Sequence, residues 1–135
     1  MKSRILNIEQ RSAQELIKHS AGPGLRFVMS DYKNNPGSSL YVAARSLINV
    51  DHPEPHVEPH VHENESMFLF LGQNLTDFTG LEAEVMLGGG LYRVQSPSAI
   101  SISGGEEHTY RPIKGSGIYL NIVLTPGANY NATTK

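Results

Sequence analysis

The sequence predicts an all-β domain, a barrel or sandwich of short strands with one short helix near the N-terminus. Thirteen glycines and eight prolines are spread along the 135 residues and divide them into short segments, a pattern typical of strands joined by turns. Most of these segments alternate in polarity or are apolar throughout, as strands that are half-buried or fully buried do. Only one segment carries a helix signal.

That helix is expected where Ser12 and Glu15 have the spacing of a capping box and two apolar residues follow. It should end between residues 19 and 22. Gly88-Gly89-Gly90 is expected to form a hairpin turn. The predicted strands are residues 4–8, 25–29, 40–49, 67–71, 82–87, 91–94, 99–102, 108–111 and 118–124.

The length suits one domain over residues 1–135, with an N-terminal extension to residue 39 and a barrel core over 40–125. The chain has no cysteine, which excludes disulfides, thiolate catalysis and Cys-ligated metal sites. The net charge is −2 and the basic residues are scattered, so no nucleic-acid partner is expected. No apolar run is long enough for a signal peptide or a membrane span, and a cytoplasmic protein is therefore expected.

Four of the six histidines fall within residues 52–62: His52, His56, His60 and His62. Residues two apart on a strand point to the same side, so His60 and His62 would aim both imidazoles at one point. His108, on a later strand, would supply a third nitrogen. Imidazole binds iron, zinc, nickel and related ions. The alternative is a solvated loop, since prolines interrupt the same segment.

Two segments resemble the motifs of the cupin superfamily. Residues 60–72 resemble the first motif, His-x-His followed by a glutamate and an apolar strand that ends in glycine. Residues 102–108 resemble the second motif, whose usual form is Pro-x-Gly-x-x-His. The resemblance covers roughly residues 40–125. It implies a double-stranded β-helix, the RmlC-like jelly roll, with one divalent metal ion (iron, zinc, nickel or manganese) inside.

The chain departs from the motif at the fourth ligand. The family usually has a glutamate four residues after the second histidine, and here that residue is Ser66. Glu65 is one residue early, and a shift of one residue on a strand turns a side chain to the other face. Glu65 is kept as a ligand candidate in case a bulge precedes the strand. Glu63 and His56 are weaker candidates, and water in the open position is the alternative.

Tyr110 and Glu84 are the candidate catalytic residues. Tyr110 would share a strand face with His108 and form a pocket wall, and Glu84 lies on a predicted barrel strand. Phe68 and Phe70 have strand spacing and are expected to fill the barrel interior.

The resemblance implies a small metal-dependent enzyme acting on a small oxygenated substrate. A dioxygenase is the first choice, with isomerase, cyclase and decarboxylase as further possibilities because fold does not fix reaction. The alternative is a non-catalytic module that binds a sugar or another small molecule. The family often forms dimers, so a homodimer with contacts from residues 4–8 and 25–29 is expected. No nucleic acid or membrane partner is expected.

Overall fold

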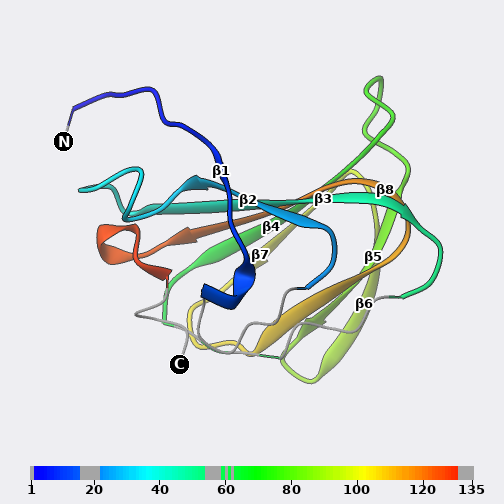
Figure 1. Ribbon diagram of the computed structural model, residues 1–135. Helices are drawn as coiled ribbons and strands as arrows, with labels where there is room; N and C mark the ends of the chain where they lie inside the picture. The colour runs from blue at the N-terminus through cyan, green and yellow to red at the C-terminus, as the bar shows by residue number, and fades with distance from the viewer. Residues whose placement is uncertain (1, 16–21, 54–58, 60, 62, 131–135) are drawn as a thin grey trace.

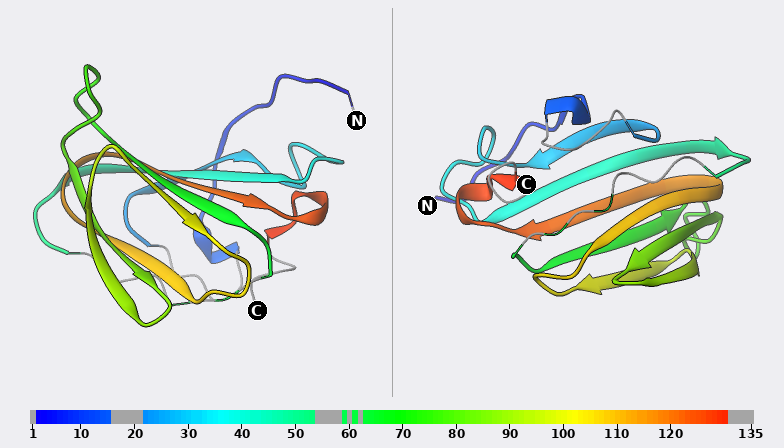
Figure 2. Two further views of the ribbon diagram at one scale, coloured as in Figure 1. Left: turned by 180° about the vertical axis from the view of Figure 1, so that it is seen from behind. Right: turned by 90° about the horizontal axis from the view of Figure 1, so that it is seen from below.

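The computed structural model describes residues 2–15, 22–53, 59, 61 and 63–130. Its strands form two facing layers (Figures 1 and 2), and apolar side chains are buried between them. This confirms the predicted all-β barrel. The elements, in chain order, are β1 (Glu9–Gln10), η1 (Ala13–Glu15), β2 (Leu25–Ser30), β3 (Leu40–Val50), β4 (Ser66–Gly72), β5 (Leu81–Leu87), β6 (Gly90–Gln95), β7 (Ser98–Ile102), β8 (His108–Leu124) and η2 (Pro126–Ala128).

The larger layer has the strand order β1-β2-β3-β8-β4-β7, and all neighbouring strands are antiparallel. The smaller layer consists of β6, β5 and the first half of β8. Strand β8 therefore belongs to both layers: its first half pairs with β5, and its second half lies between β3 and β4. The hairpin predicted at Gly88-Gly89-Gly90 joins β5 to β6.

One strand replaces the two that were predicted over residues 108–111 and 118–124. The intervening glycines let the chain bend between the layers without ending the strand. Gly115 has a φ of 99°, a region that favours glycine. A Cβ atom there would lie 1.9 Å from the carbonyl oxygen of Gly80, so the close approach of the two backbones requires a residue without a side chain.

The edge strand predicted at residues 4–8 is wrong. The edge strand is β1, which pairs with β2 through Glu9 opposite Val28 and Gln10 opposite Phe27. Residues 4–8 form no ladder, because Ile5 and Ile8 are exposed and have no sheet face to pack on. The described part of the predicted helix is the single 3₁₀ turn η1, and residues 16–21 lie outside the described residues.

The interior is formed by side chains that point inward from both layers. The main buried cluster consists of Leu47, Phe68, Phe70, Leu81, Ala83, Val85, Ile102, Tyr110 and Tyr119. Phe68 and Phe70 lie in it as predicted. A smaller cluster of Tyr41, Ala43, Val123 and Tyr130 continues it toward the N-terminal segment. Within the described part of the chain, no helix has the length and apolar character needed to span a membrane.

Candidate metal centre

His108 begins β8 and points into the barrel, where only 1% of its surface is exposed. Its ring lies edge-on to Phe68, with 5.8 Å between the ring centroids. Its Nδ1 atom is 2.8 Å from the carbonyl oxygen of Glu106. A carbonyl can only accept, so Nδ1 carries a proton, and in the neutral ring Nε2 would carry the lone pair. Metal-binding histidines are usually oriented by a hydrogen bond of this kind.

The other predicted imidazoles, His60 and His62, lie outside the described residues, as does His56. Among the residues that the structure describes, no three His, Cys, Asp or Glu side chains come together as a metal site. That finding does not bear on a site to which two undescribed histidines belong. His52 is described, and its side chain is 74% exposed.

Ser66 and Glu65 lie on opposite sides of the chain as it enters β4. Ser66 opens the strand and is buried, in step with the inward residues Phe68 and Phe70. Glu65 is exposed, and its backbone carbonyl accepts a hydrogen bond of 3.1 Å from the amide of Leu124. The residue in the family's glutamate position is thus a buried serine. Glu63 is exposed as well.

Four aromatic rings fill the interior beside His108. Tyr110 and Tyr119 stand on the two halves of β8, in different layers, and stack across the interior with ring centroids 3.8 Å apart. Phe68 meets both rings edge-on, at 5.7 and 5.2 Å. Burial raises the pKa of the Tyr110 hydroxyl, and the charge of Arg45 opposes this only in part. Tyr110 therefore keeps its proton and forms a wall of the interior.

The structure does not bring Glu84 to this interior. Ala83 and Val85 are its buried neighbours on β5, and alternation along the strand turns Glu84 to the opposite face. There it accepts a hydrogen bond of 3.1 Å from Nε of Arg111, its cross-strand neighbour. The sequence correctly indicated a strand but left the choice of face open.

No protein-family model matches the chain, and no curated protein matches it. Solved structures do. A cupin-2 domain protein from Rhodospirillum rubrum is 14% identical with a TM-score of 0.56, over 92% of this chain and 72% of that one. An RmlC-like cupin from Shewanella frigidimarina is 11% identical with a TM-score of 0.55, over 96% of this chain and 100% of that one. The chain has the cupin fold.

A third cupin with the same architecture is an oxalate decarboxylase variant from Bacillus subtilis. It is 12% identical with a TM-score of 0.59, and the match covers 99% of this chain but only 33% of the decarboxylase. At these identities the likeness establishes the fold alone. The cupin resemblance inferred from residues 60–72 and 102–108 is thereby confirmed at the level of fold.

Among the described residues, several buried polar side-chain atoms have no hydrogen-bond partner, and three of them belong to inward residues of β4 and β8: Ser66 Oγ, Tyr110 Oη and Asn121 Oδ1. Asn121 stands opposite Phe68 in the ladder between β4 and β8, so the asparagine and serine lie diagonally on neighbouring strands beside the ring that contacts His108. Buried polar atoms without partners are costly and commonly mark a site for water, an ion or a ligand. These atoms, with the buried His108, fit a metal site with a small bound molecule.

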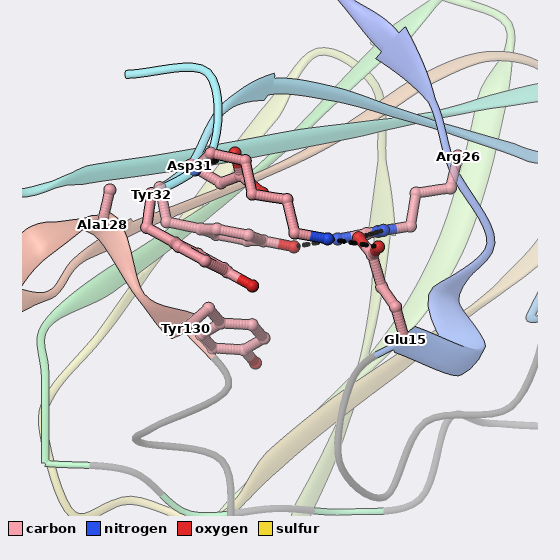
Figure 3. Close-up of a pocket in the computed structure, with 8 residues that line it drawn as sticks. Glu15, Arg26, Asp31, Tyr32, Ala128 and Tyr130 are labelled. Atoms are coloured by element: carbon pink, nitrogen blue, oxygen red, sulfur yellow. Dashed lines mark hydrogen bonds and ion pairs between the residues drawn. The ribbon is translucent and has the colours of Figure 1, made fainter. Parts of the chain in front are cut away.

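A second polar cluster lies against the inner face of β2 and β3, where η1 and the C-terminal segment cover the sheet (Figure 3). Arg26 is buried; its Nη1 donates to the Glu15 carboxylate and its Nη2 to the Tyr41 hydroxyl, both at 2.7 Å. Burial alone would lower the pKa of Arg26, but Tyr41 and Glu15 outweigh it and raise that pKa. The ring of Tyr130 stacks on Tyr41 with centroids 4.6 Å apart. This cluster was not predicted from the sequence.

Proposed function

We propose that this cupin binds one divalent metal ion through His60, His62 and His108 and acts as a small metal-dependent enzyme. The observation that carries the proposal is the state of His108. A buried imidazole whose Nδ1 donates to a backbone carbonyl has Nε2 as its other ring nitrogen, and in the neutral ring that atom can bind a metal. In an extended segment, the spacing of the other two histidines would direct their rings to one side of the chain.

The residues of the interior would bind and orient a small oxygenated substrate. Phe68 and the stacked Tyr110 and Tyr119 exclude water from one side of the site. Ser66 Oγ can donate to a carbonyl or accept from a hydroxyl, and Asn121 Oδ1 can accept from a hydroxyl. When bound, the ion would polarise a substrate oxygen or, if it is iron, activate dioxygen. A dioxygenase is the first choice of reaction.

Ser66, at the position where the family usually has glutamate, favours a second candidate function. This is a cupin that binds a sugar or another small molecule and catalyses no reaction. Ser66 supplies no carboxylate there, so the ion would rest on three imidazoles and water. Three protein ligands and an exchangeable water are typical of catalytic sites, whereas a weaker site also suits simple binding. Turnover by protein that retains its metal separates the two candidates.

Metal content is the first test. Elemental analysis of the purified protein should find about one divalent ion per chain. His108→Ala should lose most of the metal, because a metal site has few protein ligands and the loss of one weakens metal binding. The control is His52→Ala, which removes an exposed imidazole from the same histidine-rich region and should keep wild-type metal content. Equal metal in wild type and His108→Ala would exclude the site.

Two further measurements sharpen this test. Ser66→Glu places a carboxylate on the inward face of β4 and should hold the ion about tenfold more tightly against a chelator, ~1.4 kcal/mol. The Fe(II)-loaded wild type should consume oxygen with a diketone, a thiol or a catechol. Retained metal with no turnover on any of the three would favour the binding module over the dioxygenase.

A further inference from the structure

A pocket of about 240 Å³ lies between residues 10–13 and the start of β2, apart from the proposed metal ligands. Three of its eight described lining residues are arginines, Arg11, Arg26 and Arg45, and we call it the arginine pocket. The other described lining residues are uncharged, and Ala13 and Leu25 give the pocket an apolar wall. A hollow lined by charges of one sign concentrates its electric field and attracts counter-ions. The arginine pocket is therefore suited to an anion.

Two of these arginines are neighbours across the sheet. Arg26 on β2 is directly opposite Arg45 on β3, and both are buried, with 5% and 7% of their surface exposed. The backbone of Arg11 is close to them, because its amide donates to the carbonyl of Arg26 at 3.1 Å. Like charges directly opposite on neighbouring strands destabilise a sheet, and a buried charge is costly unless it is compensated. The arrangement therefore requires negative charge nearby.

The carboxylates beside the arginine pocket supply part of that charge. Arg26 Nη1 donates to the Glu15 carboxylate at 2.7 Å, and Arg11 Nη2 donates to the Asp31 carboxylate. Both carboxylates belong to the adjoining polar cluster of Figure 3 and do not line the arginine pocket. The charged side chains of the pocket and this cluster, with their ion-pair partners, are Arg11, Arg26, Lys33, Arg45, Glu9, Glu15 and Asp31. Four cations stand against three anions, so the described part of this region has one positive charge in excess.

Arg11 carries hydrogen-bond donors that no described atom uses. Its Nε and Nη1 atoms are buried and have no hydrogen-bond partner. Nε lies 3.6 Å from a Glu9 oxygen and 3.7 Å from a Glu15 oxygen, close enough for charge attraction but too far for a hydrogen bond. Buried donors without an acceptor are rare and commonly mark the place of a water, an ion or a ligand. Because Arg11 lines the arginine pocket, an anion bound there would be within its reach.

We propose that the arginine pocket binds a small organic carboxylate. Guanidinium groups pair with planar carboxylates through two parallel N–H···O bonds. The single negative charge of a carboxylate matches the single positive charge in excess, whereas a phosphate dianion would exceed it. Leu25, which is 50% exposed, and Ala13 offer apolar contact to a hydrocarbon body. Since drug-sized ligands occupy roughly 300–1,000 Å³, a pocket of about 240 Å³ limits that body to a few carbon atoms.

The test is butyrate binding, measured by isothermal titration calorimetry in a carboxylate-free buffer of constant ionic strength. The wild type should bind one butyrate per chain, and Arg11→Met should bind it about tenfold more weakly, because the variant loses charge-assisted hydrogen bonds. The matched control is Arg93→Met, which removes an exposed arginine on β6 and should keep the wild-type affinity. Equal affinity in Arg11→Met, or no binding by the wild type, would overturn the proposal.

Two comparison ligands test the chemical class. Butanol has the hydrocarbon body of butyrate without its charge, and inorganic phosphate has charge without a hydrocarbon body. Both should bind the wild type more weakly than butyrate does. Butanol binding as tight as that of butyrate would mean that the arginines play no part, and tighter binding of phosphate would mean a site for another class of anion. Either result would contradict the proposal.

Metal content separates this proposal from the proposed function. None of the described residues that line the arginine pocket is a proposed metal ligand, so Arg11→Met should contain as much metal as the wild type. Weaker butyrate binding with unchanged metal content supports a second site. Loss of the metal together with butyrate binding would instead assign the carboxylate to the metal centre and overturn the proposal.

A measurement on the wild type covers the case in which Arg11→Met does not fold. In protein labelled with nitrogen-15, butyrate should shift the Nε–H resonance of Arg11 in nuclear magnetic resonance spectra, because Nε then gains an acceptor. The Arg11 resonance is identified by its loss in Arg11→Lys, which keeps the positive charge. The Nε–H resonance of Arg93 should not move. No shift at Arg11, or an equal shift at Arg93, would overturn the proposal.

Discussion

The inner face of the larger layer has an aromatic half and an ionic half. One row of the ladder crosses both: Arg26 on β2, Arg45 on β3, Tyr119 on β8 and Phe70 on β4. On the β4 side, rings from both layers pack against one another beside His108. On the β2 side, the guanidinium of Arg26 is held by Glu15 and Tyr41 (Figure 3).

The aromatic half stabilises the barrel interior, and the ionic half holds the N-terminal segment to the barrel. The aromatic half is built from strands alone and shapes the interior next to the proposed ion. The ionic half connects the N-terminal segment to the barrel, because Glu15 lies on η1 and Arg11 pairs with Asp31 at the end of β2. Packing energy depends on volume and is insensitive to salt, whereas buried polar contacts depend on each partner being present. Substitutions in the two halves should therefore have different sizes and different signatures.

The largest loss of stability is expected from Phe68→Ala. Phe68 is 2% exposed and meets three other aromatic rings and His108. Truncating such a ring removes its burial and leaves a cavity, at a cost of about 3–5 kcal/mol. Urea unfolding should show this loss. Tyr92→Ala, at an exposed position on β6, should cost under about 0.5 kcal/mol; equal losses would mean that the aromatic half is not the core.

A smaller loss, about 2 kcal/mol, is expected from Arg26→Met. The substitution preserves much of the apolar volume but leaves the buried Tyr41 hydroxyl without its donor, and an orphaned buried group costs about 1–3 kcal/mol. Glu15 keeps Lys33 at 3.6 Å and Arg11 at 3.7 Å, so its carboxylate adds little to the loss.

Arg93→Met is the control for Arg26. Arg93 pairs with Glu82 at 3.4 Å, but its side chain is 63% exposed, and such surface pairs contribute about 0–1 kcal/mol. Urea unfolding of both variants compares a buried guanidinium with an exposed one. If Arg93→Met costs as much as Arg26→Met, the ionic half owes its stability to net charge and not to the contacts of Arg26.

Most of the barrel could be predicted from the sequence because period-two alternation is a local signal. The strands of residues 25–29, 40–49 and 82–87 were each found to within about two residues of their observed ends. The signal failed where the deciding contact is not local. In the sequence, Gly115 predicts the end of a strand. In the structure, it allows β8 to pass close to the backbone of Gly80, which is distant in the chain. Ile5 and Ile8 suggested a strand, but no neighbouring strand pairs with them.

The candidate site could be predicted in part. Counting from Phe68 and Phe70 by twos places Ser66 inward and Glu65 outward, which the sequence analysis anticipated as a risk to Glu65. The same counting did not decide the face of Glu84, because either face of β5 could have been the inner one until its pairing with β8 was known. Arg26 was missed because a lone arginine on a strand normally indicates a solvent face. Its two partners, the Glu15 carboxylate and the Tyr41 hydroxyl, lie 11 and 15 positions away in the chain.

An effect that appears only at alkaline pH is expected from the buried tyrosine hydroxyls of both halves. Burial raises the pKa of Tyr41, Tyr110 and Tyr119 above the usual value for tyrosine, about 10. The folded chain then holds protons that the unfolded chain loses above about pH 10, so stability should be constant below that pH and fall as pH rises through it. Each tyrosine contributes up to about 1.4 kcal/mol per pH unit in that range.

Replacing one of these three tyrosines should reduce the alkaline slope by its share, up to about 1.4 kcal/mol per pH unit. Tyr110→Phe is the clean change, because its hydroxyl has no hydrogen-bond partner and the ring stack is preserved; removing an unsatisfied buried group should also raise stability at neutral pH by about 1 kcal/mol. Urea unfolding at several pH values between 8 and about 11 measures both effects. Tyr92→Phe removes an exposed hydroxyl and should reproduce the wild-type profile. An unchanged slope in Tyr110→Phe would mean that this hydroxyl reaches water in the folded protein, and the aromatic half would then be an open pocket and not a sealed wall.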